Sequence, residues 1–554
     1  MLNNIKKWLG SGEPYIWLNA GAVSLSIIMV VGLVALIAVR GLGHYWPQDV
    51  VSFDYSAGGE SSVLIGELVD EETLPRSQLN SELTETGDTE ALVKRYLLKT
   101  GNRDYYGLDF RWVLEEDMGQ LETPEQVMVV ERREWGNFYG FLKELKEDGS
   151  KVTGHADQWL QFQRMIEEAG EIFQQIRHLE KDLIGAINYK MERLRLKQRG
   201  LELKGRATAS ALQEITNSEA QLQLEYEGYT QELSDLYQLL NRGSFVATLA
   251  NGESVEMPIA KVIRAHRPNT MSTTDKVLFY FEKLWEFMSA EPREANTEGG
   301  IFPAIFGTVM MVMIMAVLVT PFGVIAAVYL REYATQGPVT RLIRIAVNNL
   351  AGVPSVVYGV FGLGFFVYFL GGSIDQLLFP EALPTPTFGT PGLMWASLTL
   401  AILTVPVVIV ATEEGLSRVP RSIREGSLAL GATKAETLWL TVLPMTASAM
   451  MTGLILAVAR AAGEVAPLML VGVVKLAPSL PLDGNFPYLH LDRKFMHLGF
   501  HIYDVGFQSP NVEAARPLVY ATALLLILII IALNLTAVKI RNNLREKYRA
   551  AEQH

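Results

Sequence analysis

The sequence predicts a membrane all-α protein with six transmembrane helices and a large α+β insertion outside the membrane, between the first and second helices. The mean hydropathy is positive, at +0.18, although 19% of the 554 residues are charged. Such a chain belongs partly in lipid and partly in water. Five charge-free apolar windows, and a sixth that contains only Arg460 and Glu464, are long enough to cross about 30 Å of hydrocarbon. Residues 40–300 contain no such window and form the predicted insertion.

The Lys and Arg residues beside the windows predict the orientation of the chain, because they are enriched in short cytoplasmic flanks. Lys6 and Lys7 precede the first window, and Lys539 follows the last. Residues 1–16 and 541–554 are therefore predicted to be cytoplasmic, and the insertion periplasmic. The first window has no A-x-A-like cleavage site, so we interpret it as a retained anchor. The six predicted spans are residues 17–39, 303–330, 346–371, 393–411, 446–473 and 516–538.

The clearest pattern inside the insertion is helical. Two apolar stripes with steps of three and four residues run through residues 157–242 and are separated by the region from Gly200 to Gly205. They predict an antiparallel coiled-coil hairpin. The sequence is compatible with three surfaces that this hairpin would contact: a substrate-binding protein, a partner membrane subunit or the cell wall.

Two further elements complete the predicted insertion. Residues 244–249 and 255–263 are strand-like and flank an Asn251-Gly252 turn, which predicts a β-hairpin. An amphipathic helix near residues 276–288 is predicted to lie on the membrane surface before the second span begins.

A polar connector, residues 412–445, joins the fourth and fifth spans. Gly431 interrupts a helical pattern where the chain must turn, and Thr433 with Glu436 has the T-x-x-E spacing of a capping box. Pro444 is predicted to mark where the second short helix yields to the next span. Spacing alone would also fit an ordinary amphipathic connector.

The connector resembles the EAA loop of ABC-importer permeases, the element through which such a subunit engages its ATPase. The resemblance rests on Glu425, Gly431, Leu443 and Pro444, although Glu-Gly-Ser replaces Glu-Ala-Ala at its start. Further motifs resemble the PstA type of phosphate permease: Pro321-Phe322-Gly323, the run from Leu350 to Gly359, and the run from Arg460 to Leu468.

This resemblance covers roughly residues 298–540 and implies a type I permease core over residues 301–540. It implies that the ATPase is contacted through Glu425, Gly431, Thr433, Glu436, Leu443 and Pro444.

Arg460 and Glu464 are four residues apart in the predicted fifth span, so on a helix they share a face and can pair. A guanidinium presents a planar fork that matches two oxygens of phosphate. By the resemblance, Arg460 would attract the passing anion while Glu464 holds the arginine and prevents trapping. The alternative is an ion pair that only fixes helix packing.

Prolines and glycines inside the spans are expected to shape them. Pro354 is predicted to kink a helix, and Gly359 and Gly364 to permit close helix contact. His497 and His501 have a spacing that could suit a metal. We favour a loop on the outer membrane surface for them and predict no metal site.

The chain carries no nucleotide site of its own. A Walker A loop needs a Gly-Lys pair, and the sequence contains none. We therefore predict no catalytic residue and no bound cofactor, with ATP and Mg²⁺ used by a partner ATPase. The chain has no cysteine, and its net charge of −12 argues against binding nucleic acid.

The predicted function is that of the permease subunit of an ATP-driven phosphate importer in the bacterial inner membrane, working by alternating access. The resemblance implies a homologous PstC-like permease, two copies of a PstB-like ATPase and a PstS-like periplasmic binding protein as partners. One alternative is a permease for another oxyanion or solute. Another is a membrane sensor that signals through the coiled coil.

Overall fold

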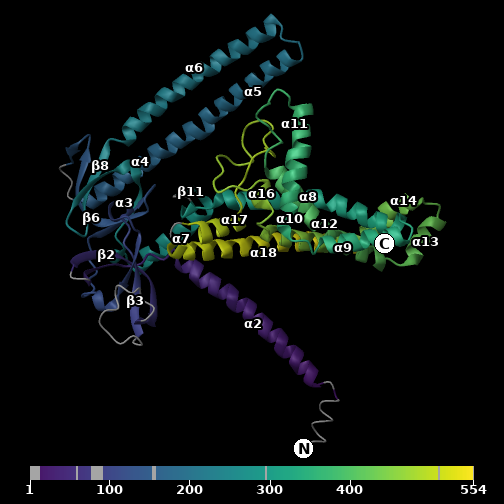
Figure 1. The fold of residues 1–554 in the computed structure, drawn as a ribbon, viewed down its shortest axis with the longest axis horizontal. Coiled ribbons are helices and arrows are strands. Elements are labelled where there is room, and N and C mark those ends of the chain that lie inside the picture. The colour runs from purple at the N-terminus through teal and green to yellow at the C-terminus, as the bar shows by residue number, and fades with distance from the viewer. Residues whose placement is uncertain are drawn as a thin grey trace, which may run out of the picture.

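The computed structural model describes residues 11, 13–57, 60–76, 92–152, 157–293, 296–509 and 512–552. Lys6 and Lys7, on which the predicted orientation partly rests, lie outside them. Figure 1 shows the long helices α8, α12 and α18 running together, with the sheets of the insertion at one end and the short helices α13 and α14 at the other.

Six helices in the described part of the chain are long and apolar enough to cross a membrane. They comprise Tyr15–Gly43, Phe302–Tyr333, Ser355–Leu378, Leu393–Arg418, Lys434–Gly463 and Ala515–Asn543. The first lies in α2 (Glu13–Gly43), the second joins α8 (Phe302–Val328) to a π-helical turn (Tyr329–Tyr333), and the third joins α10 (Ser355–Phe361), a π-helical segment (Gly362–Gly371) and α11 (Gly372–Leu378). The others lie in α12 (Leu393–Arg418), in α14 and α15 (Lys434–Glu436 and Leu443–Gly463, joined by a π-helical turn, Thr437–Val442), and in α18 (Val512–Glu552). The prediction of a membrane helical protein with six apolar helices is confirmed.

Helix α12 lies at the centre of the helical core. Two thirds of its apolar window is buried, whereas none of the window of α2 is. Small residues bring α15 close to α12: a Cβ on Gly415 would lie 2.6 Å from the Cβ of Ala449, and one on Gly453 equally close to that of Ala411. Such close approach is typical of helices that pack in membranes.

The bounds of two predicted spans need correction. The third helix starts at Ser355 and not at 346, because Pro354 separates it from an additional amphipathic helix, α9 (Pro338–Leu350). The fifth was expected at 446–473 but ends at Gly463. A short helix, α16 (Leu468–Val471), follows after a break in which Glu464 is extended and Pro467 is the N-cap residue of α16. A hydropathy window does not register either break.

The described part of the insertion contains two larger antiparallel sheets, besides a two-stranded one formed by β11 (Pro292–Arg293) and β12 (Glu298–Gly299). Strands β1 (Val50–Ala57), β2 (Glu60–Pro75), β3 (Leu92–Lys99) and β4 (Phe110–Leu114) form the first in sequence order. The second has the order β10-β5-β6-β8-β9, with β7 (Ser150–Lys151) paired to β6; its strands are β5 (Val127–Arg132), β6 (Asn137–Glu147), β8 (Gly243–Thr248), β9 (Ser254–Pro258) and β10 (Val262–His266).

Strand β5 shows why these sheets pack together. All six of its residues are buried, and alternate side chains enter different clusters. Met128 and Val130 pack with Phe162 of α4 (Gln158–His178), whereas Val127 and Val129 pack with β1 and β2. The second sheet is therefore covered on both faces.

A helical hairpin rises from the second sheet. After α4, a π-helical turn (Leu179–Ile184) leads into α5 (Gly185–Leu203), and α6 (Ala209–Leu240) returns beside it (Figure 1). The phenolic oxygen of Tyr237 in α6 lies 2.7 Å from Glu180 in the π-helical turn. Gly205, in the turn, has a φ of +63°. That these helices pack as a coiled coil remains a prediction.

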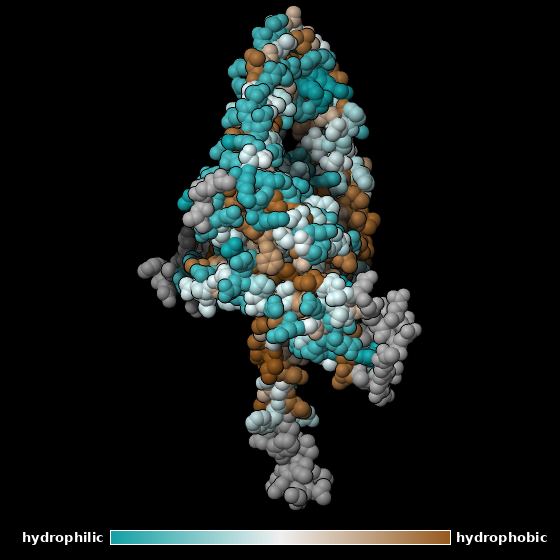
Figure 2. Space-filling model, turned by 90° about the vertical axis from the view of Figure 1, so that its left-hand side faces the viewer, coloured by the Kyte–Doolittle hydropathy of each residue, from teal (hydrophilic) through white to brown (hydrophobic). Residues whose placement is uncertain are grey.

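The predicted β-hairpin around Asn251-Gly252 forms, since β8 pairs antiparallel with β9. Its second strand was expected to continue through residue 263. Instead β9 ends at Pro258, a 3₁₀ turn (Ile259–Lys261) redirects the chain, and β10 pairs with β5 at the opposite edge of the sheet. Figure 2 looks onto the insertion, whose surface is largely hydrophilic beside the hydrophobic helix α2.

The remaining elements are short, apart from α7 (Thr273–Ser289), which connects the second sheet to α8. They are α3 (Arg103–Tyr106), a 3₁₀ turn (Glu115–Asp117), another (Pro268–Thr270), β11 (Pro292–Arg293), β12 (Glu298–Gly299), α13 (Arg421–Ala429), α17 (Leu498–Tyr503) and a π-helical turn (Asp504–Gln508).

Candidate functional site

The connector between α12 and α15 is a tight turn between two short helices. Helix α13 ends before Gly431, which has a φ of +92°, a conformation that glycine adopts without strain. The predicted capping box is confirmed: the backbone N–H of Glu436 donates to the Thr433 hydroxyl at 3.2 Å, and the N–H of Thr433 donates to the Glu436 carboxylate at 2.7 Å. The turn is therefore held by local bonds.

An ion pair and a hydrogen bond attach the connector to the π-helical turn that follows α8. Arg424 lies 3.0 Å from Glu332 and also donates to the carbonyl of Leu416 at 2.6 Å. The ammonium of Lys434 donates to the carbonyl of Glu332. Below these polar contacts, Leu438 and Val442 are buried with Leu416. These contacts fix the position of the connector relative to the spans.

Apolar side chains at the connector remain exposed. Leu430, next to the turn glycine, is 91% exposed, and Trp439 and Leu440 on the following turn are 68% and 76% exposed. Glu425 is also at the surface. Exposed apolar clusters can mark interaction sites. We therefore call Leu430, Trp439 and Leu440 the candidate docking surface.

Pro444 does not separate the connector helix from the span, contrary to the prediction. The chain is helical from Lys434 to Gly463 without a break. A π-helical turn, Thr437–Val442, precedes the proline, and such a turn changes the backbone pairing where proline supplies no N–H. The expected connector 412–445 is also largely helical, since α12 continues to Arg418.

Arg460 and Glu464 lie at the far end of this continuous helix. Their side chains form an ion pair with an N–O distance of 3.6 Å, and they are 32% and 21% exposed. Arg460 is in the last turn, whereas Glu464 is the extended residue that ends the helix, with φ −81° and ψ 131°. The two do pair, but Glu464 has left the helix and the pair borders open space.

Close packing holds the segment that follows the pair. A Cβ on Gly359 of α10 would lie 2.7 Å from the Cα of Pro467, and one on Gly362 would lie 2.3 Å from the hydroxyl of Thr399. Only glycine allows these approaches. Gly364 was predicted to do the same, yet nothing lies within 4 Å of its Cβ position, because it faces away from these neighbours.

Two acidic residues that organise loops between the long helices were not predicted. Asp375 is 1% exposed and accepts hydrogen bonds from the backbone N–H groups of Phe388 and Gly389 at 2.8 and 2.6 Å. Asp483 contacts Arg493 at 2.6 Å and His490 at 2.9 Å. The partners are distant in sequence or in irregular loops, so no spacing pattern could have identified them.

His497 and His501 are buried at the start of α17, each 1% exposed, and not on a surface loop as expected. His497 accepts a bond from the N–H of Gly499, which makes it a helix cap. Within the described residues, no group of three potential metal ligands gathers. The spacing of the histidines reflects packing between α17 and the spans.

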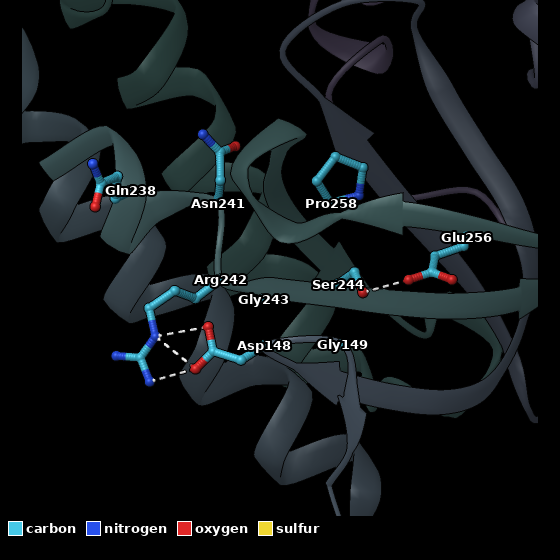
Figure 3. Close-up of a pocket in the computed structure, with 9 residues that line it drawn as sticks. All are labelled: Asp148, Gly149, Gln238, Asn241, Arg242, Gly243, Ser244, Glu256 and Pro258. Carbon is cyan, nitrogen blue, oxygen red and sulfur yellow. Dashed lines mark hydrogen bonds and ion pairs between the residues drawn. The ribbon is translucent and has the colours of Figure 1, made fainter. Parts of the chain in front are cut away.

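A hollow in the insertion lies apart from all of these residues. It is lined at the base of α6 and by β8 and β9 (Figure 3). Arg242 is paired with Asp148 at 2.9 Å, and Ser244 donates to Glu256 at 2.7 Å. Because its charged groups bind one another, this hollow has no evident ligand chemistry.

Comparison with known proteins separates the core from the insertion. Residues 319–546 match the family of binding-protein-dependent transport system inner membrane components. The phosphate transport system permease protein PstA 1 of Mycobacterium tuberculosis (strain CDC 1551 / Oshkosh) is 35% identical over 247 residues, which are 44% of this chain and 71% of the relative.

Two further comparisons involve other transporters. The phosphate transport system permease protein PstC of Xylella fastidiosa (strain 9a5c) is 32% identical over 209 residues, 36% of this chain and 64% of that protein. An inward-facing structure of the MetNI methionine ABC transporter aligns with a TM-score of 0.33 and 16% identity, over 44% of this chain and 94% of the other.

Proposed function

Because this chain belongs to the PstA family of phosphate transport permeases, we propose that it is the subunit through which an ATP-driven importer moves inorganic phosphate across the bacterial inner membrane. The observation that carries the proposal is the continuous helix Lys434–Gly463, which joins the exposed docking surface to the Arg460–Glu464 pair. At 1.5 Å per residue, Lys434 and Arg460 are roughly 40 Å apart along it. A displacement of the docking surface is therefore transmitted along this helix to Arg460.

The docking surface is proposed to receive a separate ATPase of the PstB type, which binds ATP and Mg²⁺. The turn at Gly431 presents Leu430, and the adjacent helix presents Trp439 and Leu440. Burial of such side chains in a groove would supply the affinity. Glu425, Thr433, Glu436, Leu443 and Pro444 form the remainder of this proposed coupling segment. The chain itself is a transport subunit and not an enzyme.

Arg460 is proposed to meet the anion on its path. Its guanidinium offers a fork that two phosphate oxygens can share, and Glu464 competes for the same donors at 3.6 Å. The carboxylate thus keeps the affinity low enough for release. The partial exposure of both side chains leaves room for a second, homologous subunit of the PstC type to complete the path.

We further propose that the insertion, residues 40–300, is periplasmic, with residues 1–16 and 541–554 in the cytoplasm and a permease core over 301–540. The proposed hairpin, about residues 157–242, contacts a loop of that core. The Tyr189 hydroxyl donates to the carbonyl of Phe486, and its ring meets His490 at 5.8 Å. A PstS-type binding protein would deliver phosphate on this side.

The test is phosphate uptake by proteoliposomes that contain the assembled complex. Arg460→Ala should reduce uptake strongly, Arg460→Lys less so, and Glu464→Gln should slow release because the arginine is left unopposed. Co-purification of the ATPase shows that assembly is intact. Unchanged uptake by Arg460→Ala would overturn the proposed path, and uptake of another oxyanion in place of phosphate would establish a different substrate.

A further inference from the structure

Helix α7 turns three of its large apolar side chains outward. Leu278, Phe281 and Trp285 lie on successive turns of one face and are 65%, 61% and 67% exposed. A helix on the surface of a domain in water normally presents its polar face to the solvent. This outward face of α7 therefore has the opposite polarity to that expected in water.

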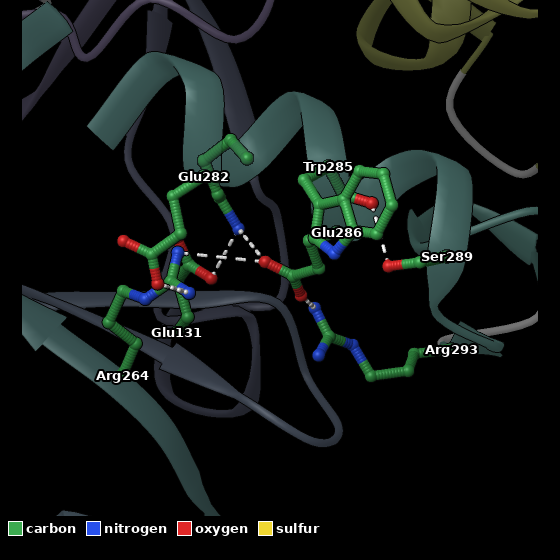
Figure 4. A network of polar contacts seen from close by, with 8 residues as sticks. Glu131, Arg264, Glu282, Trp285, Glu286, Ser289 and Arg293 are labelled. Atoms are coloured by element: carbon green, nitrogen blue, oxygen red, sulfur yellow. Dashed lines mark hydrogen bonds and ion pairs between the residues drawn. The ribbon is translucent and has the colours of Figure 1, made fainter. Parts of the chain in front are cut away.

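Lys283 and Glu286 explain this orientation, because these two charged side chains of α7 face the insertion. Lys283 contacts Glu131 of β5 at 2.6 Å and Glu286 at 3.1 Å, and Glu286 also pairs with Arg293 at 2.9 Å. Figure 4 shows Glu286 directed into this network and Trp285 directed away from it. Glu282, which borders the apolar face, pairs with Arg264 at 2.7 Å. The network prevents the helix from turning its apolar face inward.

Helix α7 lies where two membrane helices end. Phe287, on its buried side, is in one cluster with Ile301 and with residues of α8 and α18. Its ring meets that of Tyr45, just beyond α2, at 5.2 Å, and Tyr280 meets Trp46 at 6.2 Å. The outward face of α7 thus continues the apolar surface of the spans at the level where α2 ends and α8 begins (Figure 1).

We propose that Leu278, Phe281 and Trp285 dock into the bilayer interface beside the spans. Aromatic side chains with an apolar body favour that layer of the membrane, and an amphipathic helix with this polarity lies flat within it. Through Lys283 and Glu131, the embedded helix holds the second sheet at a fixed height above the lipid. The proposal does not depend on the transported substrate.

The absence of native cysteine allows a direct test. Ser289→Cys places a fluorescent nitrobenzoxadiazole label on the exposed face of α7, one turn beyond Trp285. Asn251→Cys, in the exposed β8–β9 turn, is the matched control. Each labelled chain is assembled into the complete transporter in liposomes of phosphatidylethanolamine and phosphatidylglycerol, with a spin label attached to some lipids near the headgroup.

The label at Ser289 should be quenched severalfold more strongly by the spin-labelled lipid than the label at Asn251, and less by iodide in the water. Adding Phe281→Ser should reduce the lipid quenching at Ser289 without affecting the control. Strong quenching by iodide, with none by lipid, would overturn the proposal. Protection from both quenchers would also overturn it, because a protein surface would then cover the face. Phosphate uptake, measured separately, tests the proposed function alone.

Discussion

Replacing Leu430 by alanine should weaken binding of the ATPase about 30-fold while leaving the stability of the free chain unchanged. Leu430 is 91% exposed, so its truncation removes almost no packing within the chain. In the docked complex the side chain would be buried. Loss of three carbon groups at about 0.8 kcal/mol each, scaled by that exposure, forfeits about 2 kcal/mol, which corresponds to ~30-fold in affinity.

The assay is the dissociation constant of the purified ATPase for the permease pair in nanodiscs, with thermal unfolding of the free chain measured in parallel. Leu377→Ala is the matched control, because Leu377 is 79% exposed in α11, away from the connector. Unchanged affinity for Leu430→Ala would refute docking at this turn. An equal loss for Leu377→Ala would show that the effect is unspecific.

Three other expected outcomes concern stability. Gly359→Ala should lower the unfolding temperature, since its Cβ would lie 2.7 Å from Pro467 and such overpacking costs about 1–3 kcal/mol, whereas Gly364→Ala, with nothing within 4 Å, should not. Burial lowers the pKa of His266 from 6.5 to about 4. Protonation of His266 therefore favours the unfolded chain, and the free energy of unfolding should fall as the pH drops through that window. His266→Gln should reduce the decrease in unfolding temperature that is measured between about pH 7 and about pH 5. Asp375→Asn should speed hydrogen exchange in the loop 379–392, because a neutral amide with one acceptor oxygen replaces a carboxylate that accepts two backbone bonds.

Local and hydropathic patterns predicted much of this molecule. The capping box of Thr433 and Glu436 needed only its own spacing, and the six apolar helices needed only window length. The pairing of Arg460 with Glu464 was also foreseen, although a hydropathy window could not show that Glu464 ends the helix.

What the sequence did not predict depends on contacts between distant segments. The burial of His497 and His501 follows from where α17 packs, and the role of Asp375 follows from the return of its loop. Helix α7 was predicted to be amphipathic, but the outward direction of its apolar face depends on Glu131 of β5, which is distant in the sequence.

The order of strands in the second sheet has a consequence for biosynthesis. Strand β5 is complete at residue 132, yet β10, which covers its edge, is made only at residues 262–266, after the whole helical hairpin. During synthesis the helices can form from local contacts, while the edge of β5 that β10 will cover stays unpaired. That edge is open to wrong strand pairing until the chain emerges as far as β10, so slow or interrupted synthesis within the hairpin should favour aggregation of the nascent protein.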